Sequence, residues 1–259
     1  MRVFARNWLV TVALSAGAFG WPAVSLAQAP AVFAADATRY LALGDSIAAG
    51  YKLVPVTEAY PYLLYQDGSL DVITHMLFGN AAAAGATSRD VLFYQVPQAL
   101  IPFESGGFNP KYVTLTVGGN DLLSILKFAS THQNPADVFQ FANQVLTGYA
   151  QNLGEILFEL QTGLPGAKIF VANQYTIPDI QAVLPFTDQI ISAFNSVVSQ
   201  VVGQFAGNVY VVDVYQAFLG RNGLLLGQRN AASAFETHLT TTGHRVMAQA
   251  FADVIGQNK

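Results

Sequence analysis

The chain has 259 residues, of which 52% are hydrophobic and only 11% are charged, and its formal net charge is −4. This length suits one α/β domain with a substantial core, and so few basic residues leave no basic patch for nucleic acid. Because cysteine is absent, disulfides, thiolate metal sites and a cysteine nucleophile are excluded.

The first 27 residues have the features of a secretory signal peptide. Two arginines precede an apolar run over 8–20, and small residues follow it. We expect cleavage after Ala27, with the region 32–34 as a second choice. A membrane anchor or a buried helix is the alternative, but the run is shorter than the ~20 residues that span a bilayer. The expected product is secreted, to the periplasm or outside the cell, and loss of both arginines changes its formal charge from −4 to −6.

Strand-like and helix-like segments alternate along the rest of the chain. Apolar runs predict strands at 39–43, 70–78 (a weaker signal), 112–117, 168–173 and 209–214. Apolar residues at helical spacing predict helices at 136–161, about 185–205 and 242–255. This alternation predicts a parallel sheet covered by helices on both faces, in a single domain over 36–259.

Loops of small and polar residues follow the first three predicted strands. They are Gly44-Asp45-Ser46, the segment 80–88 and the segment 118–121. Ligands bind at the carboxyl ends of the strands in a parallel sheet. We therefore expect the three loops to meet at one edge.

Each loop offers a group that acyl transfer needs. Ser46 places a hydroxyl at a strand-to-helix turn, where its N–H favours developing negative charge. The N–H of Gly85, where backbone can approach a substrate closely, is a candidate second oxyanion donor, and the side-chain amide of Asn120 is a third. The alternatives for these residues are a turn serine, a turn glycine and a helix cap.

Of the four histidines, His238 is the candidate base. It lies in a loop just before the last predicted helix, and imidazole is suited to accepting the serine proton and returning it to a leaving group. His75 and His132 are interpreted as ordinary surface or packing residues. His244, near the start of the last helix, is interpreted as structural.

Together these motifs resemble the SGNH/GDSL hydrolases. GDSI at Ser46, the 80–85 loop, GGND around Asn120 and H-x-T-x-x-G-H from His238 stand in the order of that family's motifs. The resemblance implies a flavodoxin-like, three-layer α/β/α domain and hydrolysis of esters through an acyl-serine. It also implies that Ser46 is nucleophile and oxyanion donor, that Gly85 and Asn120 complete the oxyanion hole, and that His238 is the base.

The chain departs from the family at the residue that orients the base. An aspartate usually stands three residues before the histidine, where it fixes the imidazole tautomer, but here that position is Phe235. Three alternatives stay open. Glu236 reaches the ring of His238, a backbone carbonyl orients the ring and leaves a Ser–His dyad, or the activity is weakened or lost. Glu236 is therefore a further candidate site residue.

Other classes of enzyme fit the sequence less well. An α/β-hydrolase needs G-x-S-x-G, and Ala48 stands where the second glycine should be. A metallophosphatase could use Asp45, Asn120 and Asp121 as metal ligands. The chain has only four histidines, however, and their spacing is not that of metal ligands. The chain has no P-loop and no dinucleotide-binding fingerprint. No cofactor or metal is therefore expected.

Apolar stretches near the predicted site favour fatty-acyl or aryl esters as substrates. Leu224–Leu226 and Ala182–Phe186 could receive an acyl chain or make peripheral contact with a lipid surface, or they could pack within the fold. A carbohydrate acetylesterase is one alternative. Such an enzyme would more often bind sugars on aromatic side chains, but both tryptophans fall in the signal segment. A non-catalytic lipid- or glycan-binding module is another, with Phe235 as the trace of lost chemistry. No stable protein partner is implied.

Overall fold

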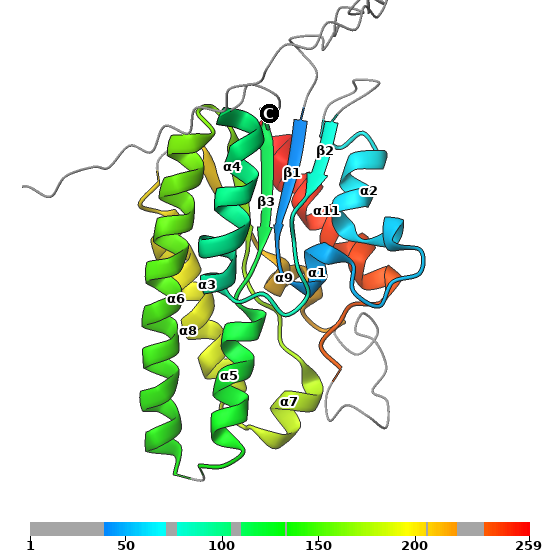
Figure 1. Ribbon diagram of the computed structural model, residues 1–259. Coiled ribbons are helices and arrows are strands. Elements are labelled where there is room, and N and C mark those ends of the chain that lie inside the picture. Colours follow the sequence, from blue (N-terminus) through cyan, green and yellow to red (C-terminus); the bar gives the residue numbers. More distant parts are fainter. Residues whose placement is uncertain (1–38, 71–76, 105–109, 133, 206, 222–235) are drawn as a thin grey trace, which may run out of the picture. The chain divides into compact units, whose positions relative to one another are not determined.

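The computed structural model of the protein describes residues 39–70, 77–104, 110–132, 134–205, 207–221 and 236–259 (Figure 1). Several expectations from the sequence lie outside these ranges. They are the signal peptide over 1–27 with its second cleavage choice, the domain start at 36, His75, Leu224–Leu226 and Phe235.

Five parallel strands form one sheet in the order β2-β1-β3-β4-β5. The strands are β1 (Arg39–Gly44), β2 (Leu77–Asn80), β3 (Tyr112–Thr116), β4 (Lys168–Ala172) and β5 (Val209–Val212). The sequence predicted a strand at each of these places, although Leu70, where it began the second one, is not in a strand. Leu70 lies in a bend instead, and its side chain is fully buried, so its apolar character reflects core packing.

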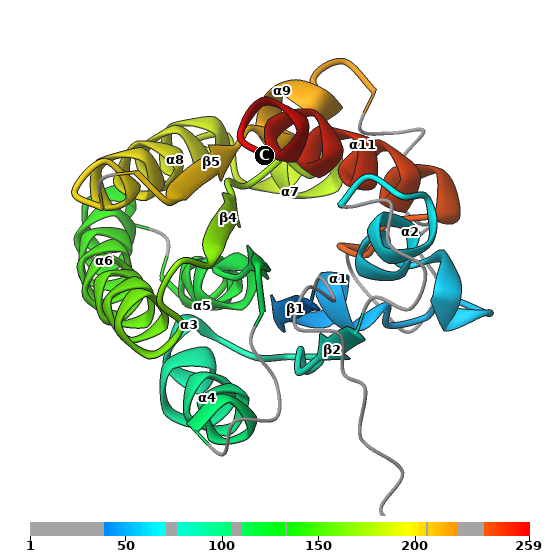
Figure 2. The same cartoon turned by 90° about the horizontal axis from the view of Figure 1, so that it is seen from above.

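Helices cover both faces of this sheet (Figures 1 and 2). Side chains such as Leu41 and Leu115 pack on one face with α4 (Val96–Glu104), α6 (Pro135–Gly163) and α8 (Thr187–Val202). Side chains such as Tyr40 and Phe170 pack on the other face with α2 (Tyr60–Gln66), α9 (Val214–Phe218) and α11 (Thr241–Gln257). The predicted three-layer α/β/α class is confirmed.

The long helices agree with the sequence-based prediction to within three residues at each end. Asn134 caps α6 by accepting the Ala136 N–H at 3.1 Å, and Thr240 caps α11 by accepting the Gly243 N–H at 3.1 Å. The remaining helical segments are α1 (Ser46–Ala49), η1 (Val56–Glu58), α3 (Ser88–Asp90), the π-helical turn η2 (Val91–Gln95), α5 (Gly119–Ala129) and α7 (Pro178–Val183).

At the carboxyl end of β1, Gly44 packs closely against the end of β3 and against the loop after β2, so the three loops of small residues meet there. Gly44 has φ +135°, and a Cβ there would overlap the carbonyl oxygen of Thr116, so only glycine fits. Its carbonyl accepts the Ala83 N–H at 3.1 Å, and the Gln95 amide bonds both its N–H and its carbonyl at 2.8 Å. Helices α5 and α7 lie beyond this edge of the sheet, in the lower part of Figure 1.

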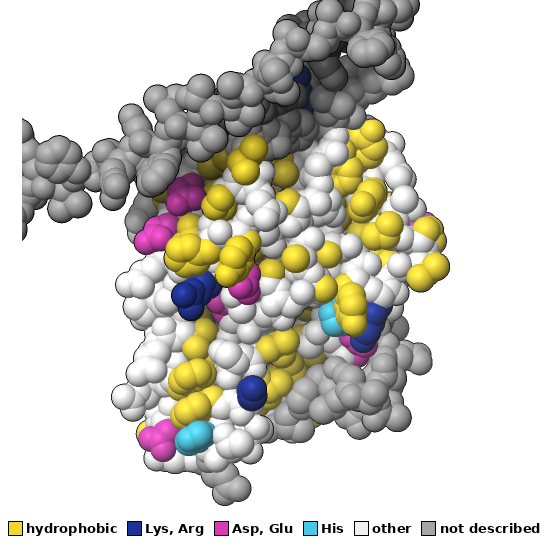
Figure 3. All heavy atoms as spheres, viewed as in Figure 1, with side chains coloured by type: hydrophobic (Ala, Val, Ile, Leu, Met, Phe, Trp, Pro, Cys, Tyr) yellow, Lys and Arg dark blue, Asp and Glu magenta, His cyan; other side chains and the backbone are white. Residues whose placement is uncertain are grey.

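Charged side chains are sparse on the face of the molecule that Figure 3 shows. Within the ranges described above, none of the helices combines the length and the apolarity of a membrane span.

Candidate active site

Ser46 is the first residue of α1 and stands two residues after Gly44, the last residue of β1. Asp45 caps this short helix, since its Oδ1 accepts the Ile47 N–H at 2.9 Å, and Gly50 ends it with φ +71°. The side chains of Ile47 and Ala48 are buried, while Ser46 is half-buried and lines a pocket. The sequence therefore folds into a turn that holds one hydroxyl at the edge of the sheet.

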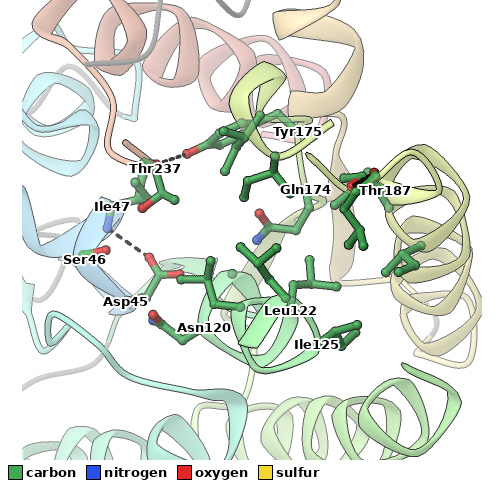
Figure 4. A pocket seen from close by; sticks show the side chains of 18 residues that line it. Asp45, Ser46, Ile47, Asn120, Leu122, Ile125, Gln174, Tyr175, Thr187 and Thr237 are labelled. Carbon is green, nitrogen blue, oxygen red and sulfur yellow. Dashed lines mark hydrogen bonds between the residues drawn. The ribbon is translucent and has the colours of Figure 1, made fainter. Parts of the chain in front are cut away.

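Asn120 lies beside the same pocket, on the first turn of α5 (Figure 4). The preceding Gly118 has φ +115°, and a Cβ there would overlap the ring of Phe194. The Asn120 side chain donates one hydrogen bond to the Ala86 carbonyl at 2.8 Å. Its Nδ2 carries a second hydrogen, so this bond orients the amide and leaves a donor for a ligand.

Gly85 lies in the exposed turn after β2. It has φ +85°, and a Cβ there would meet no atom within 4 Å. The backbone conformation, and not a close approach within the fold, is what favours glycine here. Gly85 is not among the residues that line the pocket, although Asn120 bonds the next residue, Ala86. Its part in an oxyanion hole stays a prediction.

Asp121 fixes this turn to α5. Its two carboxylate oxygens accept the Ser88 hydroxyl at 2.6 Å and the Ser88 N–H at 2.9 Å, and Asn152 donates to the same hydroxyl at 2.9 Å. Burial raises the pKa of Asp121, and the bonds from Ser88 oppose the shift. Both oxygens thus serve the structure. Among the described residues, no group of three or more His, Asp and Glu side chains is placed to hold a metal ion.

His238 contacts Glu236, the residue that the sequence offered as a replacement for the family's aspartate. Nδ1 of His238 lies 2.7 Å from Oε1 of Glu236, and the same oxygen accepts the His238 backbone N–H at 3.0 Å. Phe235 lies outside the described residues. Of the two ways of orienting this ring that the sequence left open, the structure contains the contact with Glu236.

The Glu236 carboxylate is held as an anion. It is only 6% exposed, and its second oxygen accepts a hydrogen bond from Lys52 Nζ at 2.8 Å. Burial raises the pKa of this carboxyl, but the hydrogen bonds from Lys52 and from the backbone and ring of His238 outweigh burial and lower the pKa to about 2. An ionised carboxylate only accepts hydrogen bonds. Nδ1 of His238 must therefore carry the proton, which leaves Nε2 of the neutral ring as an acceptor.

Residues 46–52, which form α1 and the turn after it, contain the candidate nucleophile and are called the nucleophile turn. They contact residues 236–240, which contain the candidate base and are called the base loop. Tyr51 donates its N–H to the Ser46 carbonyl at 3.0 Å, and its ring centroid lies 4.9 Å from that of His238. Thr237, next to His238, lines the same pocket as Ser46 (Figure 4). Within the described ranges no hydrogen bond joins the Ser46 hydroxyl to His238. The structure thus brings Ser46, Asn120 and the base loop to one pocket.

The pocket beside Ser46 is largely aliphatic and measures about 780 Å³, counting the part that opens to solvent. It extends from Asp45, Ser46 and Asn120 toward Ile125 and Thr187 (Figure 4). Its apolar lining comes from α1, from α5, α7 and α8 and from the segments that flank α7: Ile47, Leu122, Leu123, Ile125, Leu126, Tyr175, Ile177, Ile180, Leu184, Ile190 and Ile191. Leu184 belongs to the apolar segment 182–186 that the sequence associated with the substrate.

Asp45 and Gln174 are polar exceptions in this lining. Burial raises the pKa of Asp45 to about 7, since it outweighs the hydrogen bond from the Ile47 N–H, and the charge of Asp121 adds to the increase. The backbone of Gln174 is fixed by Asn195, which accepts its N–H at 2.8 Å and donates to its carbonyl at 2.9 Å. Sequence reasoning overlooked Gln174, because nothing local to it signals a pocket.

The other described histidines lie where the sequence placed them. His244 is buried, and its Nδ1 accepts the Tyr60 N–H at 3.2 Å. Burial, with a smaller effect from the charge of His238, lowers the pKa of His244 to about 4, so the ring stays neutral and structural. His132 is exposed and stacks on Phe128 with ring centroids 3.8 Å apart.

The fold and the site define a three-layer α/β/α domain with a serine beside a pocket at the carboxyl end of its first strand. Residues 42–246 match the sequence profile of the GDSL-like lipase/acylhydrolase family. The chain belongs to this family, as the sequence motifs predicted, and membership supports carboxylic ester hydrolysis as its activity. Among curated protein sequences, none matches the chain.

Solved structures with the same fold include several ester hydrolases. A lipase from a goat rumen metagenome is 19% identical (TM-score 0.64; 86% of this chain and 99% of that chain covered). A phospholipase A1 from Streptomyces albidoflavus NA297 is 20% identical (0.62; 86% and 100%). A variant of an acetylxylan esterase from Geobacillus stearothermophilus is 21% identical (0.56; 85% and 94%). At these identities the likeness establishes the fold.

Proposed function

We propose that the protein is a secreted serine esterase or lipase that cleaves carboxylic esters with apolar acyl groups through an acyl-serine intermediate. The observation that carries this proposal is the largely aliphatic pocket that opens beside Ser46 and extends between α5, α7 and α8. An acyl chain in this pocket would hold its ester carbonyl next to the serine hydroxyl. Burying such a chain yields about 0.8 kcal/mol for each CH₂ group.

The reaction follows from the groups around Ser46. Its Oγ attacks the ester carbonyl carbon while Nε2 of His238 takes the hydroxyl proton, and the resulting imidazolium is stabilised by Glu236. The oxyanion accepts hydrogen bonds from the Ser46 N–H and from Nδ2 of Asn120. The Gly85 N–H is assigned to the same oxyanion from the family pattern. The intermediate then expels the alcohol, which takes the proton from His238.

Water releases the acyl group in the second half of the reaction. His238 takes a proton from the attacking water, the acyl–Oγ bond breaks, and Ser46 recovers its proton from the ring. The products are one carboxylic acid and one alcohol, and no cofactor takes part. The low pKa of Glu236 supports this cycle, because its carboxylate remains an anion when His238 becomes positively charged.

The shape of the pocket favours acyl chains over acetyl groups. An acetyl group would fill only a small part of the space that extends from Ser46 to Ile125 and Thr187 (Figure 4). This argues against a carbohydrate acetylesterase. A non-catalytic binding module on the same fold would have no need for a carboxylate aimed at Nδ1 of a histidine.

Exposed apolar residues beside the base support contact with a lipid surface. Tyr51, whose ring contacts that of His238, is 48% exposed, and Val54 in the same turn is 97% exposed.

Secretion is supported by the charged, apolar and small-residue order of the first 27 residues. Expression of the full chain in a bacterial host, with mass spectrometry of the exported protein, tests it. We expect an N-terminus at Gln28.

A chain-length series of p-nitrophenyl esters tests the proposed activity. We expect kcat/KM to rise from acetyl to longer acyl chains. The rise should be up to about fourfold for each added CH₂ that contacts the apolar lining of the pocket. Ser46→Ala should abolish turnover of every ester. A rate that peaks at acetyl would contradict the acyl-pocket assignment, and turnover that survives in Ser46→Ala would contradict the serine mechanism.

A further inference from the structure

Lys52 joins the nucleophile turn to the base loop across 184 residues of sequence. It stands two residues after Gly50, which ends α1, and its Nζ donates to Oε2 of Glu236 at 2.8 Å. The other oxygen of Glu236 accepts from Nδ1 and from the backbone N–H of His238. Both carboxylate oxygens are thus occupied, one by the base and one by the lysine.

We propose that Lys52 is a positioning residue, which holds the Glu236 carboxylate in the orientation that aligns His238 for proton transfer. The inference rests on the proposed function, in which His238 is the base. It extends that function by a residue outside the four motifs that carry the family resemblance.

The need for a second anchor follows from the chain's departure from the family pattern. Glu236 stands two residues before the histidine, and a glutamate has one more rotatable bond than an aspartate. A carboxylate held only by His238 would be free to turn about its last bond. The hydrogen bond from Lys52 to Oε2 removes that freedom, because it fixes the plane of the carboxylate from the opposite side.

The backbone at Lys52 supports a specific role for this side chain. Lys52 has φ +69°, the only positive φ of a non-glycine residue within the described ranges. That conformation is strained for an L-residue, and glycine would adopt it freely. The lysine side chain is 41% exposed, so its ion pair adds little to stability after solvent screening. What lysine provides at this position, and glycine would not, is the hydrogen bond to Glu236.

Tyr51 and Lys52 act on the same loop from consecutive positions. The Tyr51 ring contacts the ring of His238, while Lys52 Nζ reaches past the Tyr51 ring, 5.8 Å from its centroid, to Glu236. Because Tyr51 N–H also bonds the Ser46 carbonyl, the nucleophile turn carries two residues that contact the base loop. Base and nucleophile are therefore aligned by one short segment.

The test compares Lys52→Met, Lys52→Arg and a matched control, Arg245→Met. Arg245 pairs with Glu58 at 3.1 Å, so the control also removes one positive charge and one ion pair between the turn region and α11, without touching Glu236. We expect Lys52→Met to lower kcat for a p-nitrophenyl ester by roughly 10- to 100-fold with little change in KM. Lys52→Arg should restore most of the rate, and Arg245→Met should resemble the wild type.

A second readout is independent of turnover. The NMR signal of the His238 Nδ1 proton reports its hydrogen bond to Glu236, and we expect Lys52→Met to weaken or abolish that signal while Arg245→Met retains it. The inference is overturned if Lys52→Met matches Arg245→Met in both kcat and this signal. If the wild type shows no Ser46-dependent turnover, the proposed function fails, and the proton signal alone decides the role of Lys52.

Discussion

Oε1 of Glu236 lies 2.7 Å from Nδ1 of His238, two residues further along the chain. In the family pattern an aspartate three residues before the histidine orients the ring. Here the acid is one position closer and one methylene longer, and it reaches the same ring nitrogen. The departure at Phe235 therefore does not leave the proposed base without an orienting carboxylate.

Glu236→Gln should remove most of the activity. Because Lys52 needs an acceptor, the glutamine oxygen is expected to face Lys52 and its NH₂ to face Nδ1 of His238. The ring would then carry its proton on Nε2 and could not accept one from Ser46. We expect kcat to fall by roughly 10³- to 10⁴-fold, measured with a p-nitrophenyl ester.

Glu58→Gln is the matched control, because Glu58 also pairs with a basic side chain, Arg245, and does not contact His238. Its kcat should stay near that of the wild type. A Glu236→Gln enzyme within about threefold of the wild type would favour a Ser–His dyad oriented by a backbone carbonyl.

Asp45→Asn should alter how stability depends on pH. The folded-state pKa of Asp45 is raised from 3.8 to about 7 by burial, so the folded state binds a proton that the unfolded state releases. Between about pH 4 and pH 7, Asp45 thus makes stability fall as pH rises. Asparagine keeps the cap on Ile47 without the proton, so the free energy of unfolding should fall less steeply over this range.

Urea unfolding at several pH values measures this effect, and Asp213→Asn is the control, since Asp213 is an exposed cap at the start of α9. An unchanged slope between pH 4 and 7 in Asp45→Asn would contradict the raised pKa of Asp45.

Glu236 contributes to stability in a separate pH range. Its folded-state pKa is lowered to about 2, so the stabilisation from its carboxylate is present above about pH 4.5 and is lost toward pH 2.

Leu122→Trp should shorten the acyl pocket. Leu122 lies between Asp45 and Ile125 in the pocket (Figure 4), so a larger ring there would block the way to the far wall. We expect kcat/KM for long acyl esters to fall by about fourfold for each CH₂ that loses its contact, while acetyl ester turnover changes little. Leu219→Trp, at an exposed position, should leave the profile unchanged. Equal losses for short and long esters would argue against an acyl chain in this pocket.

Gln174→Leu should favour long acyl chains. An apolar chain next to the Gln174 amide displaces water from it, and an amide buried without a partner costs about 1–3 kcal/mol. Removing the amide should raise kcat/KM for long-chain esters by on the order of tenfold, with the exposed Gln204→Leu as control. A fall in kcat/KM for long chains would show instead that Gln174 bonds the substrate.

The sheet was predictable because strands buried on both faces are short, continuous apolar runs, as in β4, where every residue after Lys168 is apolar and buried. The long helices α6 and α11 were predictable from one apolar stripe each. Helix α5 was not predicted, although it lines the pocket. Leu122, Leu123, Ile125 and Leu126 all face that pocket or its walls, so their apolar positions form no narrow stripe that local periodicity could show.

The motif residues of the site were predictable, but the contacts around them were not. Ser46 and Asn120 stand at the starts of the helices that follow β1 and β3, and the parallel sheet brings these helix starts to one edge. The bond between Lys52 and Glu236 joins residues 184 positions apart, and Lys52 has a positive φ. Nothing in the local sequence of either residue signals that pairing.

Labelling with a fluorophosphonate tests the central claim, that Ser46 is an activated nucleophile, most directly. We predict that the folded wild-type protein forms one covalent adduct, mapped to Ser46 by mass spectrometry and suppressed by a long-chain acyl ester, and that Ser46→Ala and His238→Ala lose it. Folded wild-type protein without an adduct, or with an adduct at another residue, would contradict the account and favour a binding module on the same fold.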